Sequence, residues 1–108
     1  MRDKQINIEP LEVRERVICA LLDEIERLPE GTRYGSRVFT DLAEGVRKRL
    51  GDNSITDRLV RERISDLFMF ALVAEDGKGL RITTHGREAQ QGLAAKYSAA
   101  KPRTQSTQ

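Results

Sequence analysis

The stretch GLRITTHGREA, residues 79–89, decides how the rest of the chain is organised. Residues 80–82 are typical of a β-strand, whereas residues 86–89 begin a helical pattern. Either Thr83 or Thr84 can cap that helix, because a threonine hydroxyl accepts a hydrogen bond from an unpaired N–H group of the first turn. The stretch therefore predicts a strand that passes directly into a helix without an intervening loop.

A second short run of strand character, residues 72–74, lies just upstream of this stretch. Residues 75–79, between the two runs, are rich in turn-forming residues, so the region predicts a β-hairpin. Downstream, the closing helix is expected to start near Thr83 and to reach residues 95–98. Its apolar side is weak and consists of Ala89, Leu93, Ala94 and Tyr97.

The first helix of the chain is predicted from apolar residues that recur at three- and four-residue steps as far as Leu28. Pro10 suits its first turn, where a missing N–H group costs nothing. Pro29 and Gly31 end the helix. The connector that follows has room for a very short strand around residues 33–34.

Two more amphipathic helices are predicted before the hairpin. The second helix starts at Ser36 or Arg37 and stops at Gly51, a residue type that suits the left-handed end of a helix. The third helix is capped by either Ser54 or Thr56 and runs to about residue 71. Its predicted inner side consists of Val60, Ile64 and Leu67, and its outer side of Arg58, Arg61, Glu62, Ser65 and Met69.

The length of 108 residues leaves room for one domain. We expect this domain to span residues 10–98, between a flexible N-terminus at residues 1–9 and a disordered basic tail at residues 99–108. No apolar run reaches the ~18 residues that a membrane span needs, and the first residues lack the apolar core of a signal peptide. We therefore expect no membrane association and a cytoplasmic protein.

Residues that carry catalytic or metal chemistry are scarce. Cys19 is the single cysteine, so it forms no internal disulfide, and no metal-ligand cluster surrounds it. His85 is the only histidine and is expected at an exposed helix start. Gly77 and Gly79 flank one lysine as turn residues and do not make a phosphate-binding loop. The sequence predicts no cofactor, no metal and no small-molecule ligand, and it argues against an enzyme.

The net charge of +2 conceals an asymmetry along the chain. Residues 1–30 carry five basic and eight acidic side chains, whereas residues 31–108 carry fourteen basic and nine acidic side chains. The positive excess therefore lies beyond the first helix. Such a bias favours a polyanionic partner.

The order of helix, helix, turn, helix, hairpin and helix resembles that of winged helix-turn-helix DNA-binding domains. Residues 82–88, ITTHGRE, are similar to the end of the wing in MarR-like and PadR-like regulators. Residues 64–73 are similar to a recognition helix that passes into the wing, although Ala71 stands where such families usually carry glycine. The helix spacing also resembles the C-terminal winged helix of archaeal origin-recognition initiators, without their ATPase module. The resemblance implies a mainly α fold with a small β-hairpin (α+β), flanked by an N-terminal and a C-terminal helix.

The resemblance also implies that the third helix enters the major groove of duplex DNA and that the hairpin at residues 73–82 acts as the wing. On the third helix it assigns DNA contacts to Thr56, Asp57, Arg58, Arg61 and Ser65. Arginine can pair with both acceptors of guanine, which would give sequence preference. The alternative is that these residues form an ordinary solvated helix face. Arg63 falls nearer the inner side, where it can pack its stem or pair with Asp66.

Further basic residues lie on either side of this helix. Arg47, Lys48 and Arg49 can contact phosphates beside the groove, or they can simply compensate the dipole at the end of the second helix. Lys78 and Arg81 suit a wing that reaches DNA, whereas the two acidic residues at the start of the hairpin would repel it.

These observations lead to the expectation of a sequence-specific double-stranded DNA-binding protein, a transcriptional regulator that acts as a homodimer and associates with the nucleoid. The dimer is inferred from the two outer helices, whose apolar residues one core does not fully use. A monomer with terminal helices that cover the core is the alternative. The alternative function is a winged-helix protein–protein interaction module or a replication or partition accessory protein.

Overall fold

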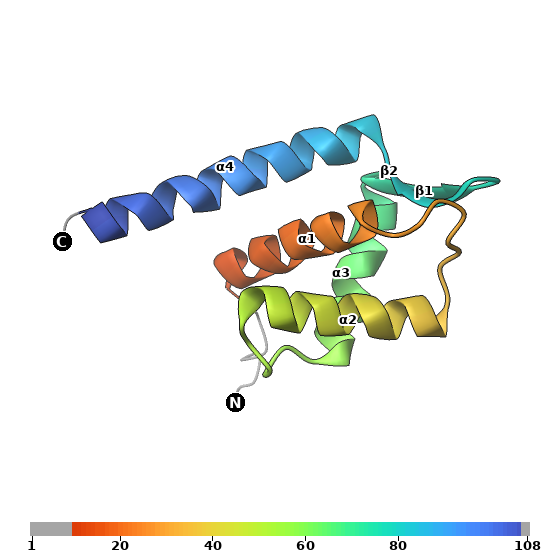
Figure 1. Ribbon diagram of the computed structural model, residues 1–108, viewed down its shortest axis with the longest axis horizontal. Helices are drawn as coiled ribbons and strands as arrows, with labels where there is room; N and C mark the ends of the chain where they lie inside the picture. The colour runs from red at the N-terminus through yellow and green to blue at the C-terminus, as the bar shows by residue number, and fades with distance from the viewer. Residues whose placement is uncertain (1–9, 107–108) are drawn as a thin grey trace, which may run out of the picture.

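The computed structural model describes residues 10–106, with side chains as far as Tyr97. Along the chain the elements are α1 (Leu11–Glu26), α2 (Ser36–Leu50), α3 (Asp57–Met69), β1 (Val73–Asp76), β2 (Gly79–Ile82) and α4 (Thr84–Ser106) (Figure 1). The fold is mainly helical with a two-stranded antiparallel hairpin, in a winged-helix-like layout. The predicted fold class is confirmed. The predicted flexible segment 1–9 lies outside the described residues.

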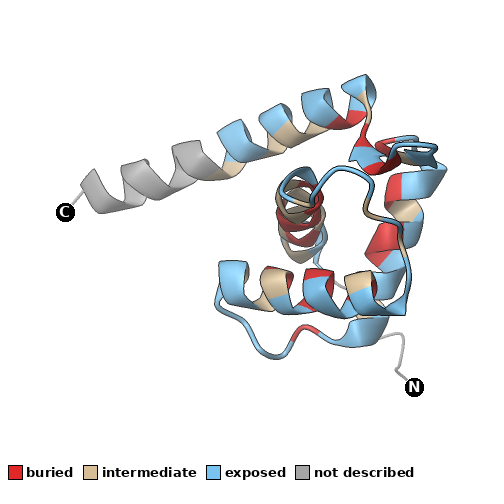
Figure 2. Ribbon diagram, turned by 45° about the vertical axis from the view of Figure 1, so that its right-hand side comes forward, coloured by how far each residue is buried: buried red, intermediate tan, exposed pale blue. Residues whose placement is uncertain are grey.

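The helix α1 is central, because α2 and α4 pack on either side of it and α3 crosses behind it (Figure 1). The largest fully buried side chains come from the first three helices: Val17, Leu21, Leu22, Leu42, Val46, Val60 and Leu67. Figure 2 shows buried positions on the inward sides of these helices. Val73, Leu80 and Ile82 of the hairpin close one end of this core. The predicted inner side of α3 is therefore confirmed.

The hairpin pairs β1 and β2 with Val73 opposite Ile82 and Asp76 opposite Gly79. Gly79 has a φ angle of +96°, and a Cβ atom there would lie 2.6 Å from the carbonyl oxygen of Thr32. Glycine alone suits a position that combines this backbone conformation with so close a neighbour. The hairpin therefore lies directly against the connector between α1 and α2.

That connector forms no strand in the described residues, so the short strand expected around residues 33–34 is not present. Two backbone hydrogen bonds still join it to the hairpin: the Leu80 N–H donates to the Thr32 carbonyl (2.7 Å), and the Gly31 N–H donates to the Lys78 carbonyl (3.0 Å). Because the chain turns at Gly31, where φ is +89°, the pairing does not extend further.

The turn between α2 and α3 is defined by its capping residues. Gly51 ends α2 in the left-handed conformation (φ 64°), as predicted. Thr56 rather than Ser54 caps α3, because the Thr56 hydroxyl accepts a hydrogen bond from the Leu59 N–H (3.0 Å). Ser54 instead donates to the carboxylate of Asp52 (2.6 Å) and stabilises the turn itself.

The chain leaves α3 sharply at Ala71, which adopts a left-handed conformation (φ 59°) although it is not glycine. The Ala71 N–H donates to the Phe68 carbonyl (3.1 Å), and the Leu72 N–H donates to the Leu67 carbonyl (2.8 Å). These two bonds form a Schellman motif. The helix therefore ends as sharply with alanine at this position as it would with glycine.

The joint between β2 and α4 needs no loop, as the sequence predicts. Thr83 caps α4, because its hydroxyl accepts a hydrogen bond from the Gly86 N–H (2.9 Å). The same hydroxyl donates to the Ala71 carbonyl (2.6 Å), and the Thr83 N–H donates to the Leu72 carbonyl (3.0 Å). A Cβ atom at Gly86 would lie 1.9 Å from that Leu72 oxygen. The joint therefore fastens the start of α4 to the end of α3.

Three helix boundaries differ from the predictions. The helix α1 ends at Glu26 rather than continuing to Leu28. Pro10 lies just before α1 in an extended conformation (ψ 146°), rather than within its first turn. The helix α4 extends to Ser106 instead of ending at residues 95–98, so it includes most of the segment expected to form a tail.

Candidate nucleic-acid interface

The outward face of α3 presents Arg58, Arg61 and Ser65 to solvent, as the sequence predicts. The side chain of Arg58 is 86% exposed and pairs at 3.3 Å with Glu62, one turn along the helix. Exposed pairs of this kind contribute little to stability. Arg58 can therefore exchange its carboxylate partner for a phosphate or a base edge.

Arg61 is held in place by α2. Its guanidinium carbon lies 4.3 Å from the centroid of the Phe39 ring, and Phe39 is anchored in the core at 7% exposure. A guanidinium stacked on a ring keeps the N–H donors in its own plane available. The stacking therefore preorganises Arg61 to bind a planar pair of acceptors, such as those of guanine or a phosphate.

At the start of α3, the predicted contact residues already have partners within the protein. Arg47 donates from Nε to the Ile55 carbonyl (2.7 Å) and pairs through Nη2 with the Asp57 carboxylate. The hydroxyl of Thr56 is occupied by its capping hydrogen bond. In this arrangement Arg47, Thr56 and Asp57 hold the turn together, and direct DNA contacts from them would have to break these bonds.

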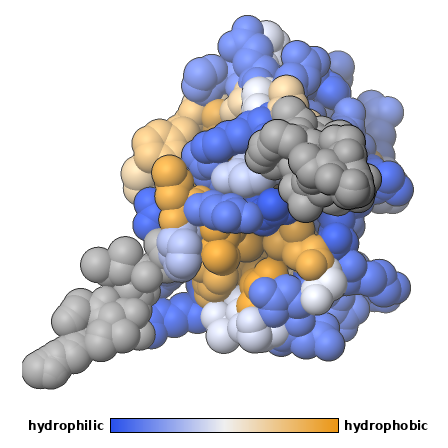
Figure 3. Space-filling model, turned by 90° about the vertical axis from the view of Figure 1, so that its left-hand side faces the viewer, coloured by the Kyte–Doolittle hydropathy of each residue, from blue (hydrophilic) through white to orange (hydrophobic). Residues whose placement is uncertain are grey.

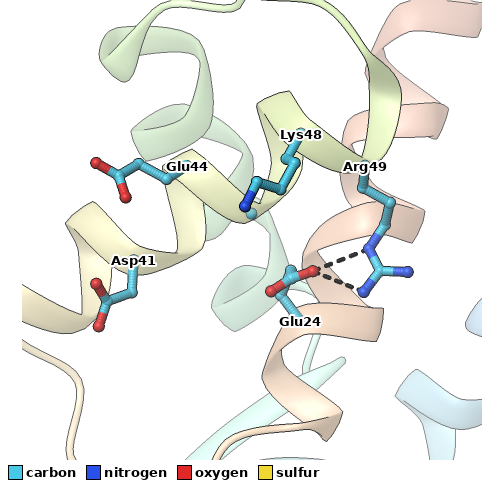
Figure 4. A pocket seen from close by; sticks show the side chains of 6 residues that line it. Glu24, Asp41, Glu44, Lys48 and Arg49 are labelled. Atoms are coloured by element: carbon cyan, nitrogen blue, oxygen red, sulfur yellow. Dashed lines mark hydrogen bonds and ion pairs between the residues drawn. The ribbon is translucent and has the colours of Figure 1, made fainter.

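The other two basic residues at the end of α2 face α1. Arg49 donates two hydrogen bonds to one carboxylate oxygen of Glu24, at 2.9 and 2.6 Å (Figure 4). Lys48 lines the same hollow as Asp41 and Glu44 (Figure 4). Because these acids offset its charge, this surface attracts a polyanion less than the outward face of α3 does.

In the hairpin, the two predicted cations differ. The guanidinium of Arg81 pairs with the Asp76 carboxylate at 2.8 Å. This bond, together with the hydrogen bond from the Lys78 N–H, lowers the pKa of Asp76. The charge of Arg81 is therefore offset, whereas Lys78 is exposed at the tip and forms no side-chain ion pair within the described residues.

Sequence reasoning did not assign two aromatic residues to the site: Tyr34, in the connector, and Phe68, within α3. The rings of Tyr34 and Phe68 meet edge to face, with centroids 6.1 Å apart. The Tyr34 N–H donates to the Glu75 carboxylate (2.8 Å), which ties the connector to the hairpin. The pKa of Tyr34 is raised, because the effect of burial is larger than the opposing effect of the positive charge of Arg61. The signal that could have identified Tyr34 from the sequence is that it is an aromatic residue in an otherwise polar connector.

Arg63 plays a structural part on the inner side of α3. It is 8% exposed, and its Nε lies 3.1 Å from the Asp66 carboxylate. The prediction that Arg63 falls nearer the inner side is confirmed, and of the two roles it was given, the pairing with Asp66 is present.

Reactive side chains are sparse in the described part of the chain. Residues 10–106 contain no group of three or more His, Cys, Asp or Glu side chains that could hold a metal ion. Cys19 is half-buried, and burial raises the pKa of its thiol, which makes it a poor nucleophile at neutral pH. His85 is exposed near Glu88. None of the described helices is both long and apolar enough to span a membrane.

Comparison with known proteins gives no match. No protein-family model matches the chain, and no curated protein or solved structure is significantly similar to it. The function is therefore inferred from the residues of the site.

Proposed function

We propose that this protein binds specific sequences of double-stranded DNA as a cytoplasmic, nucleoid-associated transcriptional regulator, with α3 in the major groove and the hairpin as the wing. The observation that carries the proposal is the exposed face of Arg58, Arg61 and Ser65 on a helix that follows a short capped turn. A helix with outward donors fits the major groove, where arginine pairs with guanine.

The position of the neutralised charges supports this assignment. The cations that fix the fold, Arg47 and Arg49, are paired with acids of the protein. Within the described part of the chain, the cations of the proposed interface are held more weakly: Arg58 pairs with an exposed carboxylate, and Arg61 stacks on an aromatic ring. Arginine is the residue type best suited to phosphate and nucleic-acid recognition, because its planar guanidinium presents several donors at once.

A homodimer would suit this function, since two copies can read two half-sites. The support for it is a hollow formed by α1, the end of α2 and α4. Ala20, Leu50 and Leu93 line it together with the charged Arg16, Asp23 and Arg49. Figure 3, which views the side of the molecule where α1 starts and α2 ends, shows apolar side chains gathered on that face. Leu11, at the start of α1, is 61% exposed. A second copy would cover these groups.

The decisive test compares two double variants that lose the same charge. Preferred sites would first be selected from random duplexes. Removing Arg58 and Arg61 (R58A/R61A) is expected to abolish the preference for the selected site, at about 1–3 kcal/mol for each bidentate contact, while weak binding persists. The control, R14A/R27A, also removes two exposed arginines, one within α1 and one at its C-terminal cap position. It should keep the preference for the selected site.

Two results would contradict the proposal. One is the absence of duplex binding at low salt, because even non-specific binding is strongest there. The other is an equal loss for every sequence in both double variants, which would leave Arg58 and Arg61 as general surface charge.

A second candidate function is supported by a different observation. Phe68, Met69 and Phe70, at the end of α3, are 38%, 72% and 59% exposed. Contiguous exposed apolar residues often mark a protein-binding surface. The chain would then be a protein-interaction module or a replication or partition accessory protein. A labelled duplex with no affinity, together with a partner captured only when residues 68–70 are intact, would favour this function.

A further inference from the structure

Four of the chain's five aromatic residues lie on α3, at its end or next to it, and only Tyr97 lies elsewhere. Phe39 is buried beneath Arg61, whereas Phe68 is 38% exposed and Phe70 is 59% exposed. An aromatic ring exposed to water lacks the favourable free energy that burial of its apolar surface would provide. Their concentration beside the proposed DNA-binding face therefore calls for a ligand that covers rings. We call Tyr34, Phe39, Arg61 and Phe68 the aromatic cluster.

The aromatic cluster is rigidly supported. Tyr34 is held by its ring contact with Phe68 at 6.1 Å and by the backbone hydrogen bond from its N–H to Glu75 (2.8 Å). Arg61 lies 4.3 Å over the Phe39 ring, and its charge acts on the Tyr34 phenol. Rings and guanidinium thus come from α2, α3 and the connector, and tertiary contacts hold them in one place.

The charge around the aromatic cluster is positive. Arg33 precedes Tyr34 and Arg37 lies at the start of α2, and both are exposed without an ion pair among the described residues. Arg61 adds a third cation, and Glu75 is the acid that contacts the cluster. This combination of rings and guanidinium groups matches a ligand that carries flat apolar faces on a chain of negative charges.

Nucleic acid has this chemistry, but only where its bases are unpaired. In a duplex the base faces are covered by their neighbours, and a protein reaches only the base edges in the grooves. In a single strand the faces are accessible and stack on aromatic side chains, while arginines bind the phosphates. We propose that the aromatic cluster binds unpaired bases of single-stranded DNA, with Phe68 as a stacking platform and the flanking arginines on the phosphates.

This proposal goes beyond the binding of duplex DNA and can fail or succeed independently of it. The test uses three labelled oligonucleotides of roughly 12 nucleotides, which is within the usual site size. One is a single strand of thymidines, the second has the same phosphates with abasic sugars, and the third is the selected duplex. Binding of each to the full chain would be followed by fluorescence anisotropy at low salt.

The thymidine strand is expected to bind about tenfold more tightly than the abasic strand, because a stacked base contributes substantially to binding. Phe68→Leu, which keeps an apolar side chain and removes the ring, should eliminate that difference. Met69→Leu is the matched control, since Met69 is the next residue, is 72% exposed and has no ring. This control should keep the difference, and thermal unfolding of both variants would verify that they fold.

The inference is overturned if the thymidine and abasic strands bind equally, because only phosphates would then be recognised. It is also overturned if Phe68→Leu and Met69→Leu behave alike, or if neither strand binds. The duplex arm separates this failure from failure of the proposed function. Site-specific duplex binding that depends on Arg58 and Arg61 would stand even if single strands showed no preference for bases.

Discussion

The hydroxyl of Thr83 shows how much one side chain can organise. It accepts a hydrogen bond from the Gly86 N–H and donates one to the Ala71 carbonyl, so it caps α4 and ties the start of that helix to the end of α3. The sequence identified Thr83 or Thr84 as the cap, because capping depends on local chemistry. It did not reveal the bond to Ala71, which depends on a tertiary contact.

Ala71 occupies a left-handed conformation that is unfavourable for any residue with a Cβ atom. Ala71→Gly is therefore expected to raise the free energy of unfolding by about 1 kcal/mol. Ala94→Gly, at an exposed position within α4, should lower it by about 1 kcal/mol. Urea denaturation measures both changes, and a less stable Ala71→Gly variant would contradict the strain argument.

Gly86 and Gly92 both lie in α4 but have opposite surroundings. A Cβ atom at Gly86 would meet the Leu72 carbonyl oxygen at 1.9 Å, whereas a Cβ atom at Gly92 would meet nothing within 4 Å. We expect Gly86→Ala to destabilise the protein by about 2 kcal/mol or more. Gly92→Ala should stabilise it by roughly 0.5–1 kcal/mol through helix propensity. Equal melting temperatures for the two variants would show that the joint tolerates a side chain.

At the scale of elements, α4 is attached differently from the other helices. Apart from the partly buried Ala89, it adds little to the apolar core, and polar contacts with α1 hold it instead. Lys96 and Tyr97 both donate to one oxygen of Glu15 at 2.6 Å. Arg87 pairs with Glu26 at 3.0 Å. The weak apolar side predicted for this helix explains why its packing relies on charge.

The polar attachment makes the docking of α4 sensitive to acid. Hydrogen bonds from Lys96 and Tyr97 lower the pKa of Glu15, and those from Gln90 and Arg87 lower the pKa of Glu26. Because both values are depressed in the folded state, their stabilisation is complete above the ordinary pKa of 4.5 and is lost as pH falls through the folded values.

Hydrogen exchange would detect this loss. Between neutral pH and about pH 3, protection of the α4 amides is expected to fall more than protection of the α2 amides, after correction for the intrinsic rates. Glu15→Gln should remove part of the pH dependence, because the amide does not titrate. An unchanged ratio of protection between the two helices would mean that the carboxylates do not hold α4.

The sequence predicted the elements more completely than the interface. Helical periodicity placed Val60 and Ile64 inside and Arg58 outside, because these assignments depend only on spacing along one helix. The partners of Arg47 and Arg49 lie 10 and 25 residues away in the chain. Such pairs depend on how helices cross, so local patterns could not separate structural cations from those available to a ligand.

At the scale of the whole molecule, the net charge of +2 is a poor guide to DNA affinity. Several basic side chains are paired with acids of the protein, and Arg58 and Arg61 are proposed to contact bases, so few cations remain to meet phosphates, among them Lys78. Affinity for duplex DNA should therefore depend on a few contacts in each copy rather than on the total charge.

This distribution predicts the salt dependence of binding. Each phosphate contact contributes about −0.9 to the slope of log affinity against log salt, so a few contacts give a slope of only about −1 to −3 for one copy and about twice that for a dimer on two half-sites. Affinity measured over a series of salt concentrations, with mass in solution from ultracentrifugation, distinguishes the two states. A slope near zero would mean that phosphates contribute little.

The joint at Thr83 and Gly86 also couples movements of α4 to the end of α3. A helix of 23 residues is about 35 Å long, and Thr83 joins its start to Ala71, just after the end of α3. Apart from this joint, side-chain contacts with α1 set its direction. A small tilt at the start of α4 becomes a displacement of several ångströms at its far end. Conversely, a displacement of the far end tilts the start of the helix. A partner that binds the far end of α4 and displaces it would therefore also change the orientation of α3.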